Sequence, residues 1–146
     1  MNTPRRRAAL AVVLLAAAVG GCGERPRPLY PVRGTVTVDG RPAADVLVRF
    51  HPRGDPSPYP MPSQALTAAD GTFTLSTNRT ADGAYAGEYA VTFLWYDVRV
   101  DSQGENVFSG PDKLGGRYRD PASSTFKVTV RPGAGEPFTF NLSRSR

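Results

Sequence analysis

The chain contains one cysteine and one histidine, the residue types on which nucleophilic and metal chemistry most often depend. Cys22 lies where an apolar run meets a Pro/Arg-rich one, and His51 lies at the end of an expected strand. A nucleophile needs a base within reach, and a metal ion needs several ligands. The sequence offers neither, so it predicts no catalytic residue, no metal ion and no cofactor. It also predicts that His51 is a surface residue without a partner.

Other polar residues give the same reading. Asp97, Asp101 and Glu105 could gather around calcium, but their spacing matches no EF-hand loop, so we expect a solvated acidic loop. Ser63 and Ser76 have neither the sequence context of a nucleophile elbow nor a base. We therefore expect a protein that is not an enzyme.

Four tyrosines are not needed by the apolar core that the sequence predicts. If they gather at one end of the domain, they could stack on sugar rings or anchor a protein partner. If they are scattered, they pack loops onto sheets. The sequence leaves both arrangements open and favours the scattered one. These residues are Tyr59, Tyr85, Tyr96 and Tyr118.

The first 21 residues have the order of a secretory signal peptide. Residues 1–7 are short and cationic, residues 8–19 are continuously apolar, and small residues precede Cys22. As a helix, the apolar run would be roughly 18 Å long, too short for a hydrocarbon core of about 30 Å. We therefore expect a segment that is cleaved rather than a retained membrane span.

The sequence Val19-Gly20-Gly21-Cys22 resembles the lipobox of bacterial lipoproteins. The resemblance implies that diacylglycerol is attached to Cys22, that the chain is cut before it, and that a fatty acid such as palmitate is added to the new amino group. Two or more acyl chains hold a protein on a membrane where one does not. Residues 22–29 then form a Pro/Arg-rich tether, and Gly23 favours the outer membrane. An ordinary signal peptide that happens to contain a cysteine is the alternative.

The net charge of +5 is concentrated in the signal segment. If residues 1–21 are removed with Arg5, Arg6 and Arg7, 15 basic residues remain against 13 acidic ones. No basic stripe is left, so nucleic acid is not an expected partner.

After Tyr30 the apolar residues follow a period of two, which indicates β-strands. Turn signals at Asp39-Gly40, Asp70-Gly71 and residues 131–136 predict three hairpins. Residues 97–124 are expected to form a long polar connection. The predicted strands cover residues 32–38, 44–52, 63–67, 72–77, 88–97, 125–130 and 137–142.

These seven strands predict an all-β fold in one domain, residues 30–143, followed by a tail at 144–146. Two antiparallel sheets packed face to face, with an Ig-like architecture, bury the alternating apolar residues most simply. Val46, Val48 and Phe50 are expected to point inward, and Leu47 outward.

Several motifs in order resemble the carboxypeptidase regulatory-like, transthyretin-like (prealbumin-like) sandwich domains of bacterial envelope lipoproteins. They are Val32-x-Gly34-x-Val36, Asp39-Gly40-x-Pro42, Val46-x-Val48-x-Phe50, Ala69-Asp70-Gly71-x-Phe73 and Gly87-Glu88-Tyr89-x-Val91. Residues 113–124 also look like a segment of those lipoproteins. The resemblance implies a fold and a non-catalytic accessory role, and it supplies no active-site residues.

The expected function is that of a lipid-anchored, non-catalytic protein of the bacterial cell envelope. Its partners would be the membrane, through the lipid on Cys22, and an envelope protein held by an interaction surface. The alternative is a module that binds a polysaccharide or another polymer through the loop tyrosines.

Overall fold

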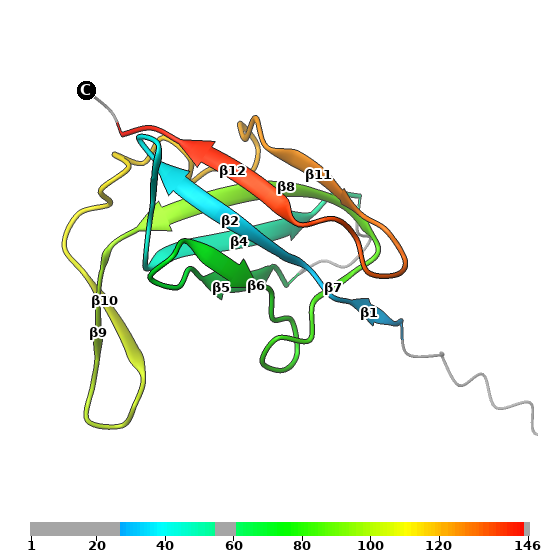
Figure 1. The fold of residues 1–146 in the computed structure, drawn as a ribbon, viewed down its shortest axis with the longest axis horizontal. Coiled ribbons are helices and arrows are strands. Elements are labelled where there is room, and N and C mark those ends of the chain that lie inside the picture. The colour runs from blue at the N-terminus through cyan, green and yellow to red at the C-terminus, as the bar shows by residue number, and fades with distance from the viewer. Residues whose placement is uncertain (1–26, 55–60, 145–146) are drawn as a thin grey trace, which may run out of the picture.

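The computed structural model describes residues 27–54 and 61–144, and within these ranges the chain is all-β and contains no helix (Figure 1). The predicted all-β class is therefore confirmed. The expected signal peptide, Cys22, Tyr59 and the end of the expected tail lie outside the described residues.

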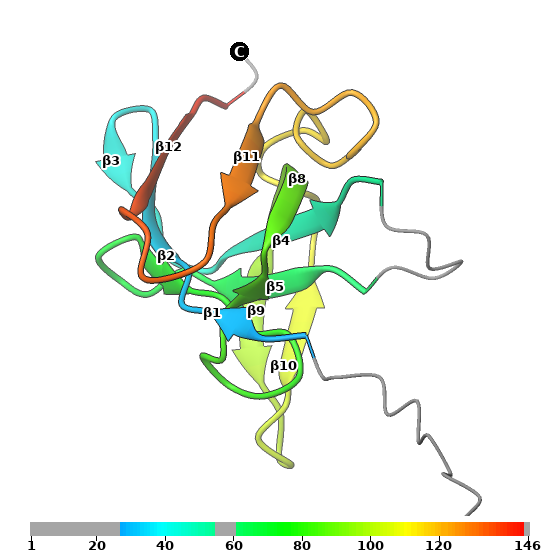
Figure 2. The same cartoon turned by 90° about the vertical axis from the view of Figure 1, so that its right-hand side faces the viewer.

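Two main sheets form the body of the domain (Figure 2). In the first sheet the strand order is β11-β8-β4-β5, and in the second it is β12-β2-β3, with β6 also paired to β2. The first sheet consists of β4 (Val46–Pro52), β5 (Ser63–Leu66), β8 (Gly87–Trp95) and β11 (Lys127–Val130). The second consists of β2 (Arg33–Val38), β3 (Arg41–Pro42), β6 (Thr72–Thr74) and β12 (Phe138–Leu142).

The core lies between these two sheets and follows the alternation in the sequence. Val36, Val48, Phe50 and Phe93 are each fully buried, because side chains at every second position of a strand share one face. Aromatic rings join the layers: the Phe140 ring of β12 lies 5.1 Å from Phe93 of β8 between centroids. In Figure 1, β12 and β2 cross over β8 and β4.

The prediction that all strands are antiparallel is wrong for one pair. β12 runs parallel to β2, with Phe140 opposite Val36. The strands on either side of residues 131–136 were expected to form a hairpin, but β11 pairs with β8 while β12 pairs with β2. A Pro/Gly-rich connection of this length spans the roughly 10 Å between packed sheets, so the chain changes sheet instead of turning back.

In each of the other two expected hairpins, the two predicted strands also belong to different sheets. The turn at Asp39-Gly40 is followed only by the two-residue strand β3, after which the chain enters β4 in the other sheet. The turn before β6 forms, because Ala68 N–H donates to the Thr72 carbonyl at 2.8 Å. Yet β5 pairs with β4, and β6 pairs with β2. Turn chemistry is local, whereas sheet membership depends on packing.

Residues 97–124 are not the plain polar connection that the sequence predicts. They begin with a hairpin of β9 (Asp97–Val100) and β10 (Asn106–Ser109), which extends away from the body (Figure 1). The rest runs beside β8, where Lys113 N–H donates to the Trp95 carbonyl at 2.7 Å. Two further short strands, β1 (Leu29–Tyr30) and β7 (Ala84–Tyr85), pair at the start of the described domain.

Leu47 points outward as expected, and it is nevertheless only 8% exposed. It does lie on the outer face of its sheet, where its cross-strand partners are Leu66 and Leu94. Flanking leucines cover it, because directly opposed side chains on neighbouring strands are in contact.

Candidate functional site

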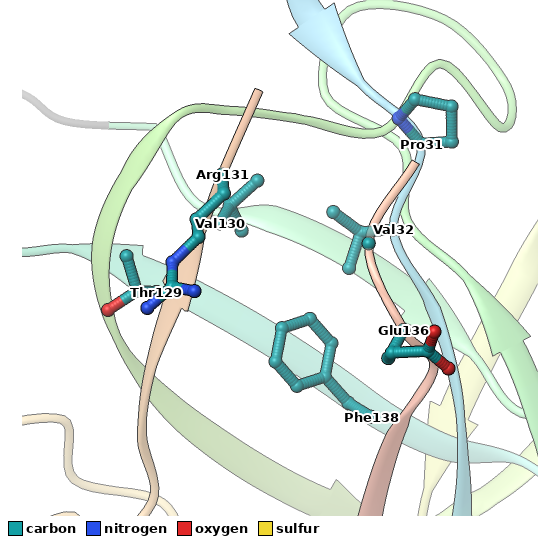
Figure 3. Close-up of a pocket in the computed structure, with 8 residues that line it drawn as sticks. Pro31, Val32, Thr129, Val130, Arg131, Glu136 and Phe138 are labelled. Carbon is teal, nitrogen blue, oxygen red and sulfur yellow. The ribbon is translucent and has the colours of Figure 1, made fainter. Parts of the chain in front are cut away.

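A small pocket opens between β11 and β12, the edge strands of the two sheets on one side of the domain (Figure 3). Its volume is about 270 Å³. We call it the notch. Apolar side chains from three segments of the chain line it, and the chain between β11 and β12 supplies its polar edge. The lining residues are Pro31, Val32, Thr129, Val130, Arg131, Gly135, Glu136 and Phe138.

The charges of the notch lie at its margins. Arg131 and Glu136 are both exposed, and in Figure 3 they lie on opposite sides of Val130 and Val32. Val130 is 5% exposed and Val32 is 3% exposed, so the inner part of the notch belongs to the core. An apolar floor between two opposite charges suits an apolar group whose flanks are polar.

The chemistry of the notch is that of binding. Its side chains include one hydroxyl, on Thr129, and no histidine or cysteine. A nucleophile is activated by an adjacent base, and the carboxylate that lines the notch, Glu136, lies across it from Thr129 (Figure 3). The arrangement can hold a group by apolar contact and orient it by charge.

The three described tyrosines of the predicted set lie in different surroundings. Tyr85 of β7 is half-buried, and its ring lies under the Arg27 guanidinium at 4.6 Å. Tyr96 follows β8 and packs edge-on against Phe108, with 6.4 Å between ring centroids. Tyr118 packs against the Phe93 ring at 6.3 Å.

Tyr118 belongs to the margin of the core. Its hydroxyl accepts a hydrogen bond from the Ser143 backbone N–H at 3.2 Å. Burial raises the pKa of Tyr118, but its hydrogen bonds with Ser143 outweigh burial and hold the pKa below its ordinary value. This tyrosine fastens the long connection to the end of β12.

These positions do not make a shared platform for sugar rings. Tyr85 precedes β8 and Tyr96 follows it, and a strand of nine residues spans about 30 Å. Tyr118 is occupied by core contacts, and Tyr59 lies outside the described residues. Among the described tyrosines, the arrangement is the scattered one.

His51 has a partner, so its expected isolation is wrong. Its Nε2 atom lies 2.8 Å from the Thr92 hydroxyl oxygen, across the pair of strands β4 and β8. Burial lowers the pKa of His51, and the nearby Arg49 charge lowers it further. A neutral histidine that is bonded to a buried threonine stabilises the outer face of the sheet.

The acidic residues of the long connection are also engaged. Asp97 forms an ion pair with Lys113, with 2.8 Å between Oδ1 and Nζ. Asp101 accepts hydrogen bonds from the backbone N–H groups of Gln103 and Glu105 and so shapes the turn of the β9–β10 hairpin. Within residues 27–54 and 61–144, no group of three His, Cys, Asp or Glu residues could hold a metal ion.

Asp112 organises residues 113–124, the last part of the long connection. Its carboxylate accepts hydrogen bonds from the backbone N–H groups of Trp95, Leu114 and Gly116, at 3.0, 3.0 and 2.8 Å. These bonds place Leu114, which is fully buried, against the core. The segment therefore secures the end of β8.

Sequence reasoning missed the notch and the exposed apolar residues of the β9–β10 hairpin. Val100, Val107 and Phe108 are 67%, 45% and 43% exposed. The alternation in residues 97–100, followed by a turn that contains Gly104, was a usable signal for the first strand of this hairpin. No local signal marks the notch, because residues far apart in the sequence form it.

Among the described residues, no helix has the length and apolarity that crossing a membrane requires. No family model matches the chain, and no curated protein matches it. One solved structure, a 9R-lipoxygenase from Cyanothece PCC8801, is similar over 80% of this chain with 12% sequence identity and a TM-score of 0.36. The chain spans 16% of the length of that protein, and a likeness this weak carries no argument about fold or function.

Proposed function

We propose that the protein is a non-catalytic component of the bacterial cell envelope, anchored by lipid on Cys22, and that its all-β body makes protein contacts. One observation carries the proposal: an apolar run of signal-peptide length ends at Gly20-Gly21-Cys22, and a Pro/Arg-rich tether follows. The outer membrane is the proposed location, because Gly23 follows the cysteine.

The body supports a role in binding. Several of its ionisable residues serve the fold: Asp112 bonds three backbone N–H groups, Asp97 pairs with Lys113, and His51 bonds to Thr92. Its accessible apolar features are the notch and the β9–β10 hairpin. Apolar groups exposed beside charges are typical of surfaces that meet other proteins.

We also infer that the fold is a variant of the seven-stranded transthyretin-like sandwich. The two main sheets contain seven strands of three or more residues, and the β9–β10 hairpin lies outside these sheets. The parallel pair β2–β12 and the β9–β10 hairpin depart from the seven-stranded antiparallel sandwich that the sequence predicts. An experimental structure with a different strand order in either sheet would overturn this inference.

Metabolic labelling tests the anchor. Cells that produce the full chain are grown with an alkyne-bearing palmitate analogue, and the purified protein is examined for label and for intact mass. We expect label on the native protein and none on Cys22→Ser, while the control Gly23→Ser keeps its label. A mass that retains Met1, or an unmodified thiol, would refute the anchor.

A second experiment tests the non-catalytic role. The purified protein is incubated with ester, peptide and ureide substrates, beside His51→Ala as the control variant. We expect no turnover above background for either protein. Turnover that disappears in His51→Ala would overturn the proposal.

A further inference from the structure

The outer edge of β12 carries backbone groups that are not used within the described domain. The Leu142 carbonyl accepts a hydrogen bond from Asp39 N–H at 3.0 Å, so Leu142 directs its backbone groups toward β2. Because alternate residues of a strand direct these groups to opposite sides, Phe140 and Phe138 also bond toward β2. The N–H and C=O groups of Thr139 and Asn141 then point to the free edge.

This edge lacks the features by which proteins usually protect an edge strand. β12 has the sequence Phe-Thr-Phe-Asn-Leu and contains no charged residue, no proline and no bulge. Edge strands are normally guarded by lysine, proline or irregular pairing. β11 carries such a residue, Lys127, within the strand, whereas Pro137 and Arg144 near β12 lie outside it. The β12 edge is thus the better acceptor of the two.

At the β11–β12 side of the domain, the first sheet also extends further than the second. Phe140 of β12 packs against Phe93 of β8, so β12 lies over β8 rather than over β11. At β11, Phe126 is covered by Phe140, with 5.6 Å between ring centroids, but Val128 remains half-buried. No described strand of the second sheet continues beyond β12. A strand added to the β12 edge would lie over the inner face of β11.

The notch lies where such a strand would place side chains. Its walls are Val130 of β11, Phe138 of β12 and Val32, and Figure 3 shows these three side chains around one space. Its volume of about 270 Å³ is smaller than the roughly 300–1,000 Å³ of typical small-molecule pockets. The space fits one bulky apolar side chain better than it fits a whole ligand.

We propose that the free edge of β12 accepts an extended segment of a partner protein as an added strand, with one bulky apolar side chain of that segment in the notch. This proposal rests on the proposed function and names the surface through which it acts. An extended peptide is the occupant that matches, because a backbone offers donors and acceptors at the spacing of Thr139 and Asn141. Arg131 and Glu136 then favour an acidic and a basic residue beside the apolar one.

Selection from a displayed library of random twelve-residue peptides provides the probe. The purified protein is used as bait, and the enriched peptides are synthesised for binding measurements and for amide hydrogen exchange. We expect sequences in which apolar and polar residues alternate around one large apolar residue. We also expect the Thr139 and Asn141 amides to exchange about tenfold more slowly when a peptide is bound.

Two pairs of variants test the edge and the notch separately. Thr139→Pro removes the outward N–H, which an edge position tolerates, while Thr139→Val keeps it. Gly135→Trp adds a ring at the notch, and Gly135→Ala adds only a methyl group, where no heavy atom lies within 4 Å of the added carbon. We expect Thr139→Pro and Gly135→Trp each to weaken peptide binding by about tenfold or more, and the controls to bind as the native protein does.

The peptide itself supplies a test that does not depend on how a variant folds. N-methylation of every second residue blocks one edge of an extended peptide, and methylation of the alternate set blocks the other. We expect one methylated series to lose binding and the other to keep it. Equal binding by both series, or enriched peptides that bind Thr139→Pro and Gly135→Trp unchanged, would overturn the proposal.

Two further outcomes are decisive. If the purified protein forms a dimer in sedimentation that Thr139→Pro abolishes, a second copy is the occupant and the proposal of a partner segment fails. Photo-crosslinking in cells then separates this inference from the proposed function. Protein crosslinks from a photoreactive residue at position 105 but not at 139 refute the β12 edge and leave the proposed function standing. If neither position forms a crosslink to a protein, the result contradicts both this inference and the proposed function.

Discussion

The two sides of the domain join their sheets in opposite ways. On the β5 side, the chain after β6 crosses to the other sheet, and Gln64 and Ser76 exchange two backbone hydrogen bonds of 2.9 Å. The Ser63 and Thr77 hydroxyl oxygens lie 2.7 Å apart beside them. On the β11–β12 side, the notch separates the two edge strands. We call these the closed side and the open side.

The difference shows that strand alternation does not determine which edges of a domain are used internally. Both sides consist of two short strands joined by a turn, yet one is closed by polar groups and the other is lined by apolar groups. Buried polar groups must find partners, so the closed side is specified by its own hydrogen bonds. The open side has backbone groups and apolar surface left for another chain.

The largest expected effect comes from removing the Phe50 ring, which contacts residues toward both sides. Phe50 is fully buried and contacts Phe73 toward the closed side and Phe138 toward the open side, with centroid distances of 6.4 and 5.7 Å. We expect Phe50→Ala to lower the free energy of unfolding by about 3–5 kcal/mol, because the loss of transfer energy is joined by a cavity. Chemical denaturation measures it.

Met61, which is 79% exposed, supplies the control for that measurement. Met61→Ala should change the free energy of unfolding by less than about 0.5 kcal/mol. If Phe50→Ala costs no more than Met61→Ala, the two sides do not share a common core.

A matched pair of threonines compares the two sides directly. On the closed side, the Thr77 hydroxyl donates to the Gly83 carbonyl at 2.6 Å and meets Ser63, which is 2% exposed. Thr77→Val leaves these groups without a partner, so we expect a loss of about 1–3 kcal/mol in the free energy of unfolding. Thr139→Val on the open side should change it by less than about 0.5 kcal/mol, since that side chain is exposed. Equal losses from both substitutions would remove the distinction.

The alternation of apolar residues predicted the strands and most of the core. Val46, Val48 and Phe50 were placed inward, and they are buried. This worked because a residue's face depends on its neighbours two positions away. Two other buried residues were missed: Leu114 is fully buried because Asp112 shapes the turn that holds it, and Leu47 is covered by leucines on neighbouring strands.

Sheet membership and the candidate site could not be predicted in the same way. The parallel pairing of β12 with β2 joins segments about a hundred residues apart, and the turn before β12 carries no information about it. The notch combines Val32, Val130 and Phe138 only after this pairing is made. Tyr118 looked unneeded in the sequence because it lies in a segment without regular alternation, yet it packs against Phe93 of the core.

Amide hydrogen exchange gives a smaller but more local comparison. The Gln64 and Ser76 N–H groups donate to each other's carbonyl groups on the closed side, whereas the Thr139 and Asn141 N–H groups point to the free edge. We expect the first pair to exchange roughly fivefold more slowly, as one net hydrogen bond stabilises by about 1 kcal/mol. Equal protection of the two pairs in the unliganded protein would mean that the β12 edge is already paired.

The smallest expected effect is that of low pH on hydrogen exchange in the loop that contains Asp82, on the closed side. Burial raises the pKa of Asp82, but backbone N–H groups of Thr77, Arg79 and Asn78 outweigh it and hold the pKa below the ordinary value of 3.8. A carboxylate whose pKa is lower in the folded state stabilises that state above the ordinary value, and the stabilisation is lost as pH falls through the folded-state pKa. We therefore expect hydrogen exchange at residues 77–79 to accelerate below about pH 4 after correction for intrinsic rates, while the open side changes little. Asp82→Asn should remove this acceleration. If the native protein and Asp82→Asn show the same pH dependence, the carboxylate does not hold the closed side together.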